Sequence, residues 1–221
     1  MTHRIEHTAD HVHVALDRPR RILSSAVLGG GFTRASHILN LRVEENFLGE
    51  KDFENPEHAL ARYAQNQGWS GAVVGLMTAA SMDSFRACTH EEQGISVTAL
   101  TTSGLSNARC AGDPADCHGL LPPPGTINTV LLTNVALTDA AMVEALLVAT
   151  EAKSAVLRDM GIQSRASSAI ATGTGTDALV LVSGEGPPSA RFCGKHVLPG
   201  QLVATTVMQS LKESLQWYCA H

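Results

Sequence analysis

The stretch best suited to chemistry is a glycine-punctuated polar turn that runs into an apolar segment, Ala169-Ile-Ala-Thr-Gly-Thr-Gly-Thr-Asp-Ala-Leu-Val-Leu-Val-Ser183. Its glycines permit close backbone approach to a ligand, and its threonine hydroxyls surround a single charge. The apolar run that follows predicts a buried strand, which would hold the turn rigidly at one end. The simpler interpretation is a tight turn whose side chains cap local backbone groups. The candidate residues here are Thr172, Gly173, Thr174, Gly175, Thr176 and Asp177.

Two further loops of the same kind lie at the ends of expected strands. One covers residues 101–108 and includes Asn107, and the other covers residues 125–128 and includes Thr126 and Asn128. If the three loops converge, their hydroxyls, carboxamides and backbone N–H groups form one wall. Such a wall suits an uncharged, amide-rich ligand better than a phosphate ester, because few cations lie nearby. The same wall is able to stabilise an oxyanion.

Other residues with chemical potential have simpler interpretations beside the functional one. Gly30 lies in a triple-glycine turn, whose amides either face a ligand or serve turn geometry alone. Lys153 interrupts a mostly apolar helix, either as an exposed edge or as a functional group. The histidines at positions 3, 7 and 11 would share one face of a helix, but no carboxylate or thiolate completes a metal site, so a solvated segment is favoured. The cysteines match no paired zinc spacing, and no metal site is predicted.

The elements that must hold these residues alternate unevenly between strands and helices. The uneven order predicts an α/β fold, a single-domain layered sandwich with helices packed on a mixed β-sheet. We expect residues 1–20 to form an N-terminal extension and residues 21–221 to form one domain. Neither a phosphate-binding loop nor the full dinucleotide glycine spacing is present. The expected strands are 21–28, 35–43, 71–77, 94–100, a run within 125–134, and 178–182, and the expected helices are 55–67, 138–160 and 198–217.

Composition excludes several classes of protein. The chain has 221 residues, of which 44% are hydrophobic and 17% charged, as in ordinary globular proteins. Its net charge of −5 and the lack of a basic block argue against nucleic acid as the main partner. No apolar run is long enough for a transmembrane helix, and residues 1–21 lack the apolar core of a secretory signal. Five scattered cysteines fit reduced thiols, so a cytoplasmic location is expected.

Taken together, several of these segments resemble the adenosylcobinamide amidohydrolase (CbiZ) family. The resemblance runs from about residue 20 to residue 215, and its motifs are specific in combination rather than singly. One departure is Gly200-Gln201, where family members often have Gly-Glu, which leaves the carry-over at Gln201 open. The matching segments are Gly29-Gly30, Thr102-Ser-Gly-Leu-Ser-Asn-Ala108, Gly125-Thr-Ile-Asn128, Thr150-Glu-Ala-Lys153, Ala171-Thr-Gly-Thr-Gly-Thr-Asp-Ala178 and Gly194-Lys-His196.

The resemblance implies hydrolysis of the amide that joins aminopropanol to a corrin side chain, giving adenosylcobyric acid in cobamide salvage. The corrinoid is then the substrate, and no cofactor is expected. Such a reaction needs an activated nucleophile, oxyanion stabilisation and a proton for the leaving amine. Asp177 would activate water or orient Thr174, Asn128 and the amides of residues 173–175 would hold the oxyanion, and His196 or Lys153 would protonate the leaving nitrogen. The expected substrate-binding residues are Gly30, His37, Asn107, Thr126, Thr172, Gly173, Gly175 and Thr176.

Three alternatives stay open at the level of sequence. A corrinoid-binding protein without catalysis would use the same loops. A threonine-nucleophile hydrolase of other small amides would use the same hydroxyls. A metal-dependent hydrolase would require His37, His118 and His196 to converge, which spacing alone does not show. The need for a metal, the preference for cobinamide or complete cobamides, and a homo-oligomeric state also remain open.

Overall fold

The computed structural model describes residues 2–43, 55–116 and 125–221. Its helices are α1 (Pro56–Asn66), the short 3-10 helix η2 (Met82–Ser84), α2 (Asp139–Asp159) and α3 (Leu198–Ala220). Its longer strands are β1 (His3–His7), β2 (His11–Ser24), β3 (Gly31–Arg42), β4 (Val73–Thr78), β5 (Arg86–Glu92), β6 (Ile95–Ser103), β8 (Ile127–Thr133) and β11 (Ala178–Val182). Two-residue strands are β7 (Ala108–Arg109), β9 (Ala136–Leu137), β10 (Gly173–Thr174) and β12 (Ser189–Ala190).

The predicted fold class is confirmed, because helices pack on a large mixed sheet. In the described part of the chain the main sheet has eight strands in the order β4-β3-β2-β11-β8-β6-β5, with β1 paired to β2. Neighbours β3–β4 and β8–β11 are parallel, whereas the other pairs are antiparallel. The parallel pair β8–β11 places Asn128 opposite Ala178. The two polar loops that lead into these strands therefore end side by side at the same edge of the sheet.

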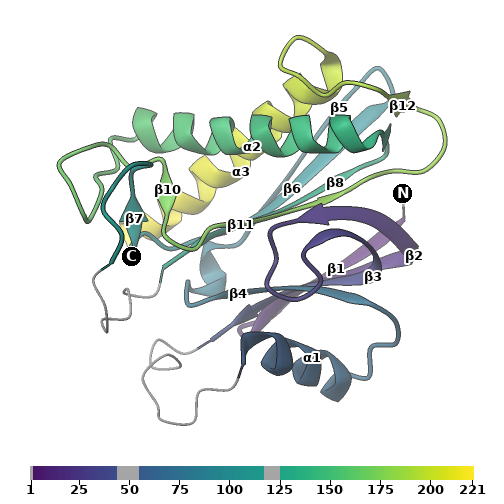
Figure 1. Cartoon of the computed structure of the whole chain (residues 1–221), viewed down its shortest axis with the longest axis horizontal. Helices are drawn as coiled ribbons and strands as arrows, with labels where there is room; N and C mark the ends of the chain where they lie inside the picture. The colour runs from purple at the N-terminus through teal and green to yellow at the C-terminus, as the bar shows by residue number, and fades with distance from the viewer. Residues whose placement is uncertain (1, 44–54, 117–124) are drawn as a thin grey trace.

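The sheet folds back on itself so that its two halves stack face to face (Figure 1). One apolar cluster joins inward side chains of β2, β3 and β4 to those of β6, β8 and β11, among them Ile38, Val74 and Val130. Helices α2 and α3 cover the outer face of the β6–β8–β11 half, and α1 covers the outer face of β3 and β4. The result is a four-layer α/β/β/α arrangement, in which a central strand such as β8 alternates between two buried faces, whereas β1 and β5 stay largely exposed.

The long strand β2 connects the two halves, and it corrects the expectation of an N-terminal extension. Residues 11–15 pair with β3 on one side of a register shift, and residues 20–24 pair with β3 and β11 on the other. The shift contains Pro19, which has no N–H to give to a ladder and is tolerated at such a bulge. Residues 3–20 therefore belong to the sheet, because Val12 and Val14 supply a buried apolar face. The N-terminal histidines lie on strands rather than on one face of a helix.

The helix that carries Lys153 is defined by local sequence at both ends. Thr138 is the N-cap of α2, and its hydroxyl accepts a hydrogen bond from Ala141 N at 3.2 Å. Buried alanines and valines, including Ala145, Ala149 and Ala152, pack its inner face against the sheet and α3. Their small side chains let the helix lie close to β8 and β11. In the described residues, no helix is long and apolar enough to cross a membrane.

Candidate active site

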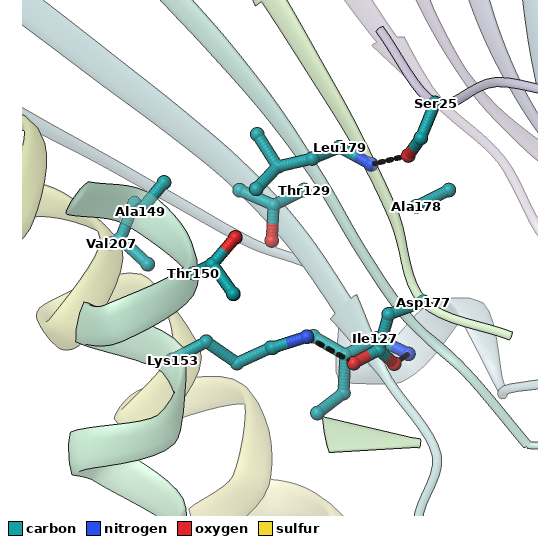
Figure 2. A pocket seen from close by; sticks show the side chains of 10 residues that line it. All are labelled: Ser25, Ile127, Thr129, Ala149, Thr150, Lys153, Asp177, Ala178, Leu179 and Val207. Atoms are coloured by element: carbon teal, nitrogen blue, oxygen red, sulfur yellow. Dashed lines mark hydrogen bonds and ion pairs between the residues drawn. The ribbon is translucent and has the colours of Figure 1, made fainter. Parts of the chain in front are cut away.

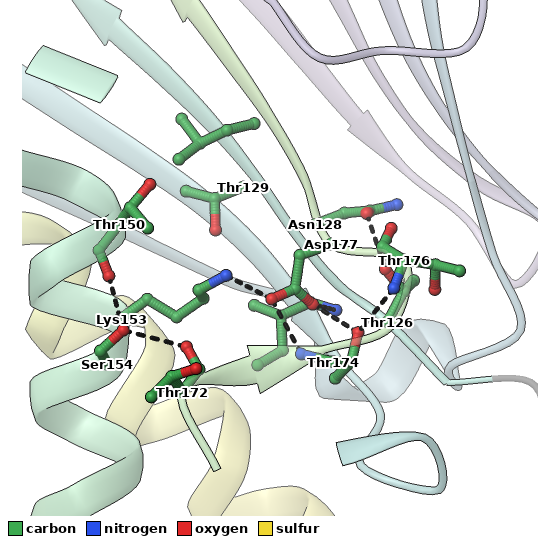
Figure 3. A network of polar contacts seen from close by, with 12 residues as sticks. Thr126, Asn128, Thr129, Thr150, Lys153, Ser154, Thr172, Thr174, Thr176 and Asp177 are labelled. Carbon is green, nitrogen blue, oxygen red and sulfur yellow. Dashed lines mark hydrogen bonds and ion pairs between the residues drawn. The ribbon is translucent and has the colours of Figure 1, made fainter. Parts of the chain in front are cut away.

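The three polar loops meet at one edge of the sheet, and Figure 3 shows two of them, those of Thr126 and of Thr172 to Asp177. Short strands β7 and β10 pair, so Gly173 lies opposite Arg109 and Thr174 opposite Ala108. Gly175 N donates to Asn107 O at 3.0 Å, and the Thr126 hydroxyl donates to Thr176 O at 2.9 Å. Segments far apart in sequence are thus fixed to one another mainly through backbone groups.

Asp177 is the centre of this arrangement. Its Oδ1 accepts hydrogen bonds from Ile127 N at 3.0 Å and from the Thr174 hydroxyl. Its Oδ2 accepts from Thr174 N at 3.0 Å and from Lys153 Nζ. Four donors match the acceptor capacity of a carboxylate, so its orientation is fully determined. The ion pair is mostly shielded from water, with side-chain exposures of 16% for Lys153 and 14% for Asp177.

A pocket of about 100 Å³ lies beside this ion pair, between α2, α3 and strands β8 and β11 (Figure 2). Its wall combines the ion pair with three hydroxyl-bearing residues, Ser25, Thr129 and Thr150, and with aliphatic side chains. An ammonium, a carboxylate and hydroxyls in a half-enclosed apolar site interact more strongly than they would in water. The complete lining is Ser25, Ile127, Thr129, Ala149, Thr150, Lys153, Asp177, Ala178, Leu179 and Val207.

Two glycines of the predicted turn are needed because other groups occupy the space of a side chain. A Cβ on Gly173 would collide with Asp177 Oδ2 and lie 2.9 Å from Lys153 Nζ. A Cβ on Gly175 would lie 2.5 Å from Asn107 Nδ2. The glycines therefore let the backbone pass directly behind the ion pair and against Asn107.

Asn128 lies on the opposite face of β8 from the pocket, because it alternates with Ile127 and Thr129. Its side-chain amide donates to Asn40 Oδ1 and to Met77 O, both at 2.8 Å, across the stacked halves of the sheet. Asn40 in turn donates to the Thr102 hydroxyl at 2.9 Å. Each of these buried groups is satisfied, so the structure places Asn128 in a bridge between layers rather than beside Lys153.

The remaining turn residues hold the loops together. Thr172 accepts from Ala111 N at 2.9 Å through its hydroxyl and from the Ser154 hydroxyl at 3.0 Å through its carbonyl oxygen. The Thr176 hydroxyl donates to Gly125 O at 3.0 Å. The expected oxyanion donors Thr174 N and Gly175 N are engaged with Asp177 and Asn107, which leaves Lys153 as the charged donor that lines the pocket.

Three residues expected at the site lie elsewhere. Gly30 is in the turn between β2 and β3, where a Cβ would collide with the Ala26 carbonyl oxygen. His37 on β3 contacts Ser70 O and His13 and stacks on Trp69, on the side of the molecule covered by α1. His196 is exposed in the turn before α3 and does not line the pocket.

Sequence reasoning missed Ser25, Thr129 and Thr150 as pocket residues. Thr150 and Lys153 are three residues apart on one helix and therefore share a face, a signal that was available in the sequence. Thr129 lies opposite Leu179 in the β8–β11 register, which only the three-dimensional pairing reveals. Ser25 follows β2, and its hydroxyl accepts from Leu179 N at 3.1 Å.

Among the residues that the structure describes, no group of three or more histidine, cysteine, aspartate or glutamate side chains is placed to hold a metal ion. His37 and His196 are not among the residues that line the pocket, and His118 falls outside the described residues. The described part of the chain therefore offers no set of metal ligands that would support a metal-dependent hydrolase.

A cation held against a carboxylate, beside hydroxyls in a small pocket, can transfer protons and stabilise a developing negative charge. Hydrolysis of an acyl bond requires both, so these groups suit a hydrolase. Comparison with known proteins narrows this class. A family model described as adenosylcobinamide amidohydrolase matches residues 1–221, and the chain belongs to this family of amide hydrolases.

Curated relatives agree with the family match. An adenosylcobinamide amidohydrolase of Methanosarcina mazei is 27% identical over 201 residues, covering 87% of this chain and 88% of the relative. Another, from Halobacterium salinarum, is 30% identical over 192 residues, covering 84% and 76%. An uncharacterised protein of Methanocaldococcus jannaschii is 34% identical over 218 residues, covering 89% and 82%.

Solved structures also show similarity. A protein from Pyrococcus horikoshii OT3 aligns with a TM-score of 0.47 and 12% identity, covering 96% of this chain and 79% of the other. An L-aminopeptidase D-Ala-esterase/amidase from Ochrobactrum anthropi aligns with a TM-score of 0.41 and 12% identity, covering 96% and 81%.

Proposed function

We propose that this protein hydrolyses the amide between aminopropanol and the corrin side chain of adenosylcobinamide, releasing adenosylcobyric acid. The family match and the names of the relatives from Methanosarcina mazei and Halobacterium salinarum support this substrate. The observation that carries the chemistry is the ion pair of Lys153 and Asp177, which lines a pocket and is fixed from behind by Thr174 and Ile127.

Lys153 is the proton donor and charge stabiliser in this proposal. Substrate binding draws its ammonium from Asp177 to the scissile amide, where it stabilises the negative charge that develops on the carbonyl oxygen. It then gives a proton to the leaving nitrogen, so aminopropanol departs as a neutral amine. The aliphatic wall formed by Ala149, Leu179 and Val207 lowers the local dielectric constant, which strengthens both effects.

Asp177 is the base that activates water. Once Lys153 moves to the substrate, Oδ2 has a free lone pair and accepts a proton from a water molecule, whose oxygen attacks the carbonyl carbon. The C–N bond breaks, and Asp177 returns its proton to Lys153 through their direct contact. One water is consumed, and one acid and one amine are formed.

Thr174 orients Asp177 rather than attacking the substrate. Its hydroxyl and its backbone N–H both donate to the carboxylate, and it is not among the residues that line the pocket as the structure describes it. Water is therefore the favoured nucleophile of the two that the sequence leaves open.

Incubation of the purified protein with adenosylcobinamide, followed by mass analysis, tests the proposal. Equimolar adenosylcobyric acid and aminopropanol are expected, with a loss of at least about 100-fold in kcat for Asp177→Asn. Thr174→Val should reduce kcat less, and no acyl adduct should accumulate on the protein after an acid quench. A spectral change on binding without aminopropanol release would instead establish a non-catalytic corrinoid-binding protein.

A further inference from the structure

The pocket beside Lys153 is small, and its walls separate into two kinds. Ala149, Leu179 and Val207 are aliphatic, whereas Ser25, Thr129 and Thr150 carry hydroxyls. Its volume is about 100 Å³. For comparison, an apolar cavity of about 150 Å³ takes up benzene, which has six heavy atoms. The pocket therefore has room for a group of about four or five heavy atoms.

We propose that this pocket receives the aminopropanol leaving group and selects substrates whose leaving group ends in a free hydroxyl. The inference rests on the proposed function and specifies its substrate range. With the nitrogen beside Lys153, three carbons and one oxygen remain to be accommodated, which matches the volume. The methyl group packs on the aliphatic side, and the hydroxyl meets the hydroxyl-bearing side.

Charge argues against a larger, phosphate-bearing leaving group. Among the described residues that line the pocket, Lys153 is the only cation, and the proposed reaction commits it to the scissile amide. A phosphate on the aminopropanol oxygen would bring negative charge next to Asp177 with no free cation to neutralise it. Complete cobamides, which carry a phosphate and a nucleotide base at this oxygen, are therefore poor substrates.

Thr129 is the residue that recognises the aminopropanol hydroxyl. It is buried on β8, and its Oγ1 has a long contact of 3.4 Å to the Thr101 hydroxyl. By contrast, the Thr150 hydroxyl donates to Leu146 O at 2.8 Å, and the Ser25 hydroxyl accepts from Leu179 N. A contact of 3.4 Å is weak, so the Thr129 hydroxyl keeps both its donor and its lone pairs for a ligand, whereas Thr150 has used its donor and Ser25 one lone pair.

A wider groove explains where the rest of the substrate lies. Thr150 lines both the pocket and a groove of about 530 Å³ that runs along α2 past Ala155 to Ile170 and Ala171. Its apolar wall suits the edge of a corrin ring, and Glu151 and Arg158 at its border can meet the ring's carboxamides. The scissile amide then bridges groove and pocket beside Lys153.

The experiment compares four substrates with the wild-type protein. They are adenosylcobinamide, its phosphate ester, a complete adenosylated cobamide, and the corresponding corrin n-propylamide, which lacks the leaving-group hydroxyl. We expect kcat/KM to fall about tenfold for the propylamide, as for the loss of one hydrogen bond, and at least tenfold for the two phosphate-bearing substrates.

Variants assign the recognition to one residue. Thr129→Val should lower kcat/KM about tenfold for adenosylcobinamide and leave the propylamide unchanged, and Thr129→Ser should restore the preference. Thr98→Val, on neighbouring β6 and bonded to Thr89, is the matched control with no change for either substrate.

Equal hydrolysis of the phosphate-bearing substrates, or an equal effect of Thr129→Val on both amides, would overturn the inference while leaving the proposed function intact. Failure to hydrolyse any of the four would overturn the proposed function and the pocket assignment together.

Discussion

Lys153 and Asp177 come from α2 and from the start of β11, and a shared set of backbone groups holds them in place. Asp177 is fixed by Thr174 and Ile127, and the absence of a side chain at Gly173 leaves space for both partners. A catalytic pair needs this kind of support, because an error of about 1 Å in position costs large factors in rate. The glycine is therefore as much a part of the site as the charged residues.

Gly173→Ala should lower kcat for adenosylcobinamide at least tenfold, because the new Cβ would displace Asp177 Oδ2 and Lys153 Nζ. A second variant, Gly94→Ala, is the control. Gly94 lies in the β5–β6 turn at φ +76, and a Cβ added there would meet no other atom within 4 Å. Gly94→Ala should cost about 1 kcal/mol of unfolding free energy and leave kcat unchanged. Normal kcat in Gly173→Ala would contradict the assigned geometry.

At the level of elements, α2 sets the position of Lys153 relative to the sheet. Its N-cap Thr138 accepts from Ala141 N and donates to Arg191 O at 3.2 Å, so it fixes both the helix start and the segment before α3. The helix then runs for more than five turns with its small residues against β8 and β11.

Thr138→Ala should lower the free energy of unfolding by about 1 kcal/mol, and Thr138→Ser should restore most of it. Chemical denaturation measures this change. Because the cap lies far along the helix from Lys153, kcat at a temperature well below the unfolding transition should stay within about twofold. A large loss of kcat with unchanged stability would show that the cap acts on the site directly.

The sequence predicts elements better than it predicts their arrangement. Helices α1, α2 and α3 follow from caps and periodic apolar residues, and β11 follows from its apolar run. Strand β5 was not predicted, because its residues are mostly polar. It is the last strand in the order of the sheet, where, among the described strands, it pairs with β6 alone. Strand β2 begins earlier than expected because its histidines are buried by partners that are distant in sequence.

The sequence could predict those parts of the candidate site whose residues lie close together in the chain. The polar turn places Thr174 next to Asp177, and both belong to one segment. Alternation along a strand tells which residues share a face but not which layer that face meets, so Asn128 and His37 could not be assigned from sequence. Thr129 required the register between β8 and β11.

At the scale of the whole molecule, the layer between α1 and the sheet contains a histidine cluster that the proposed chemistry does not use. His13 is 1% exposed and stacks on Trp69 at 3.6 Å between ring centroids. His37 Nε2 must donate to Ser70 O, which leaves its Nδ1 to accept from His13 Nε2 at 3.1 Å. Burial, followed by the proximity of His37 and His11, lowers the pKa of His13 from 6.5 to about 4.

This depressed pKa makes stability depend on pH. The unfolded chain binds a proton at this histidine below about pH 6.5, whereas the folded protein does not until about pH 4. The stability that comes from keeping His13 neutral is therefore fully present above pH 6.5. It is lost as the pH falls from 6.5 to 4, which lowers the free energy of unfolding by on the order of 2 kcal/mol. Unfolding free energies measured across this range should fall in the wild type and fall less in His13→Gln. His58→Gln, at an exposed position on α1, should leave the slope as in the wild type.

The most direct test of the central claim is the rate of aminopropanol release from adenosylcobinamide by three proteins side by side: wild type, Lys153→Met and Lys195→Met. Each lysine forms an ion pair with a carboxylate, Lys153 with Asp177 and Lys195 with Glu151. The second pair is exposed, at 67% of the Lys195 side-chain surface and 59% of that of Glu151. We predict release by the wild type and by Lys195→Met at similar rates, and a loss of at least about 100-fold in Lys153→Met. Release by folded Lys153→Met at the wild-type rate would contradict the account.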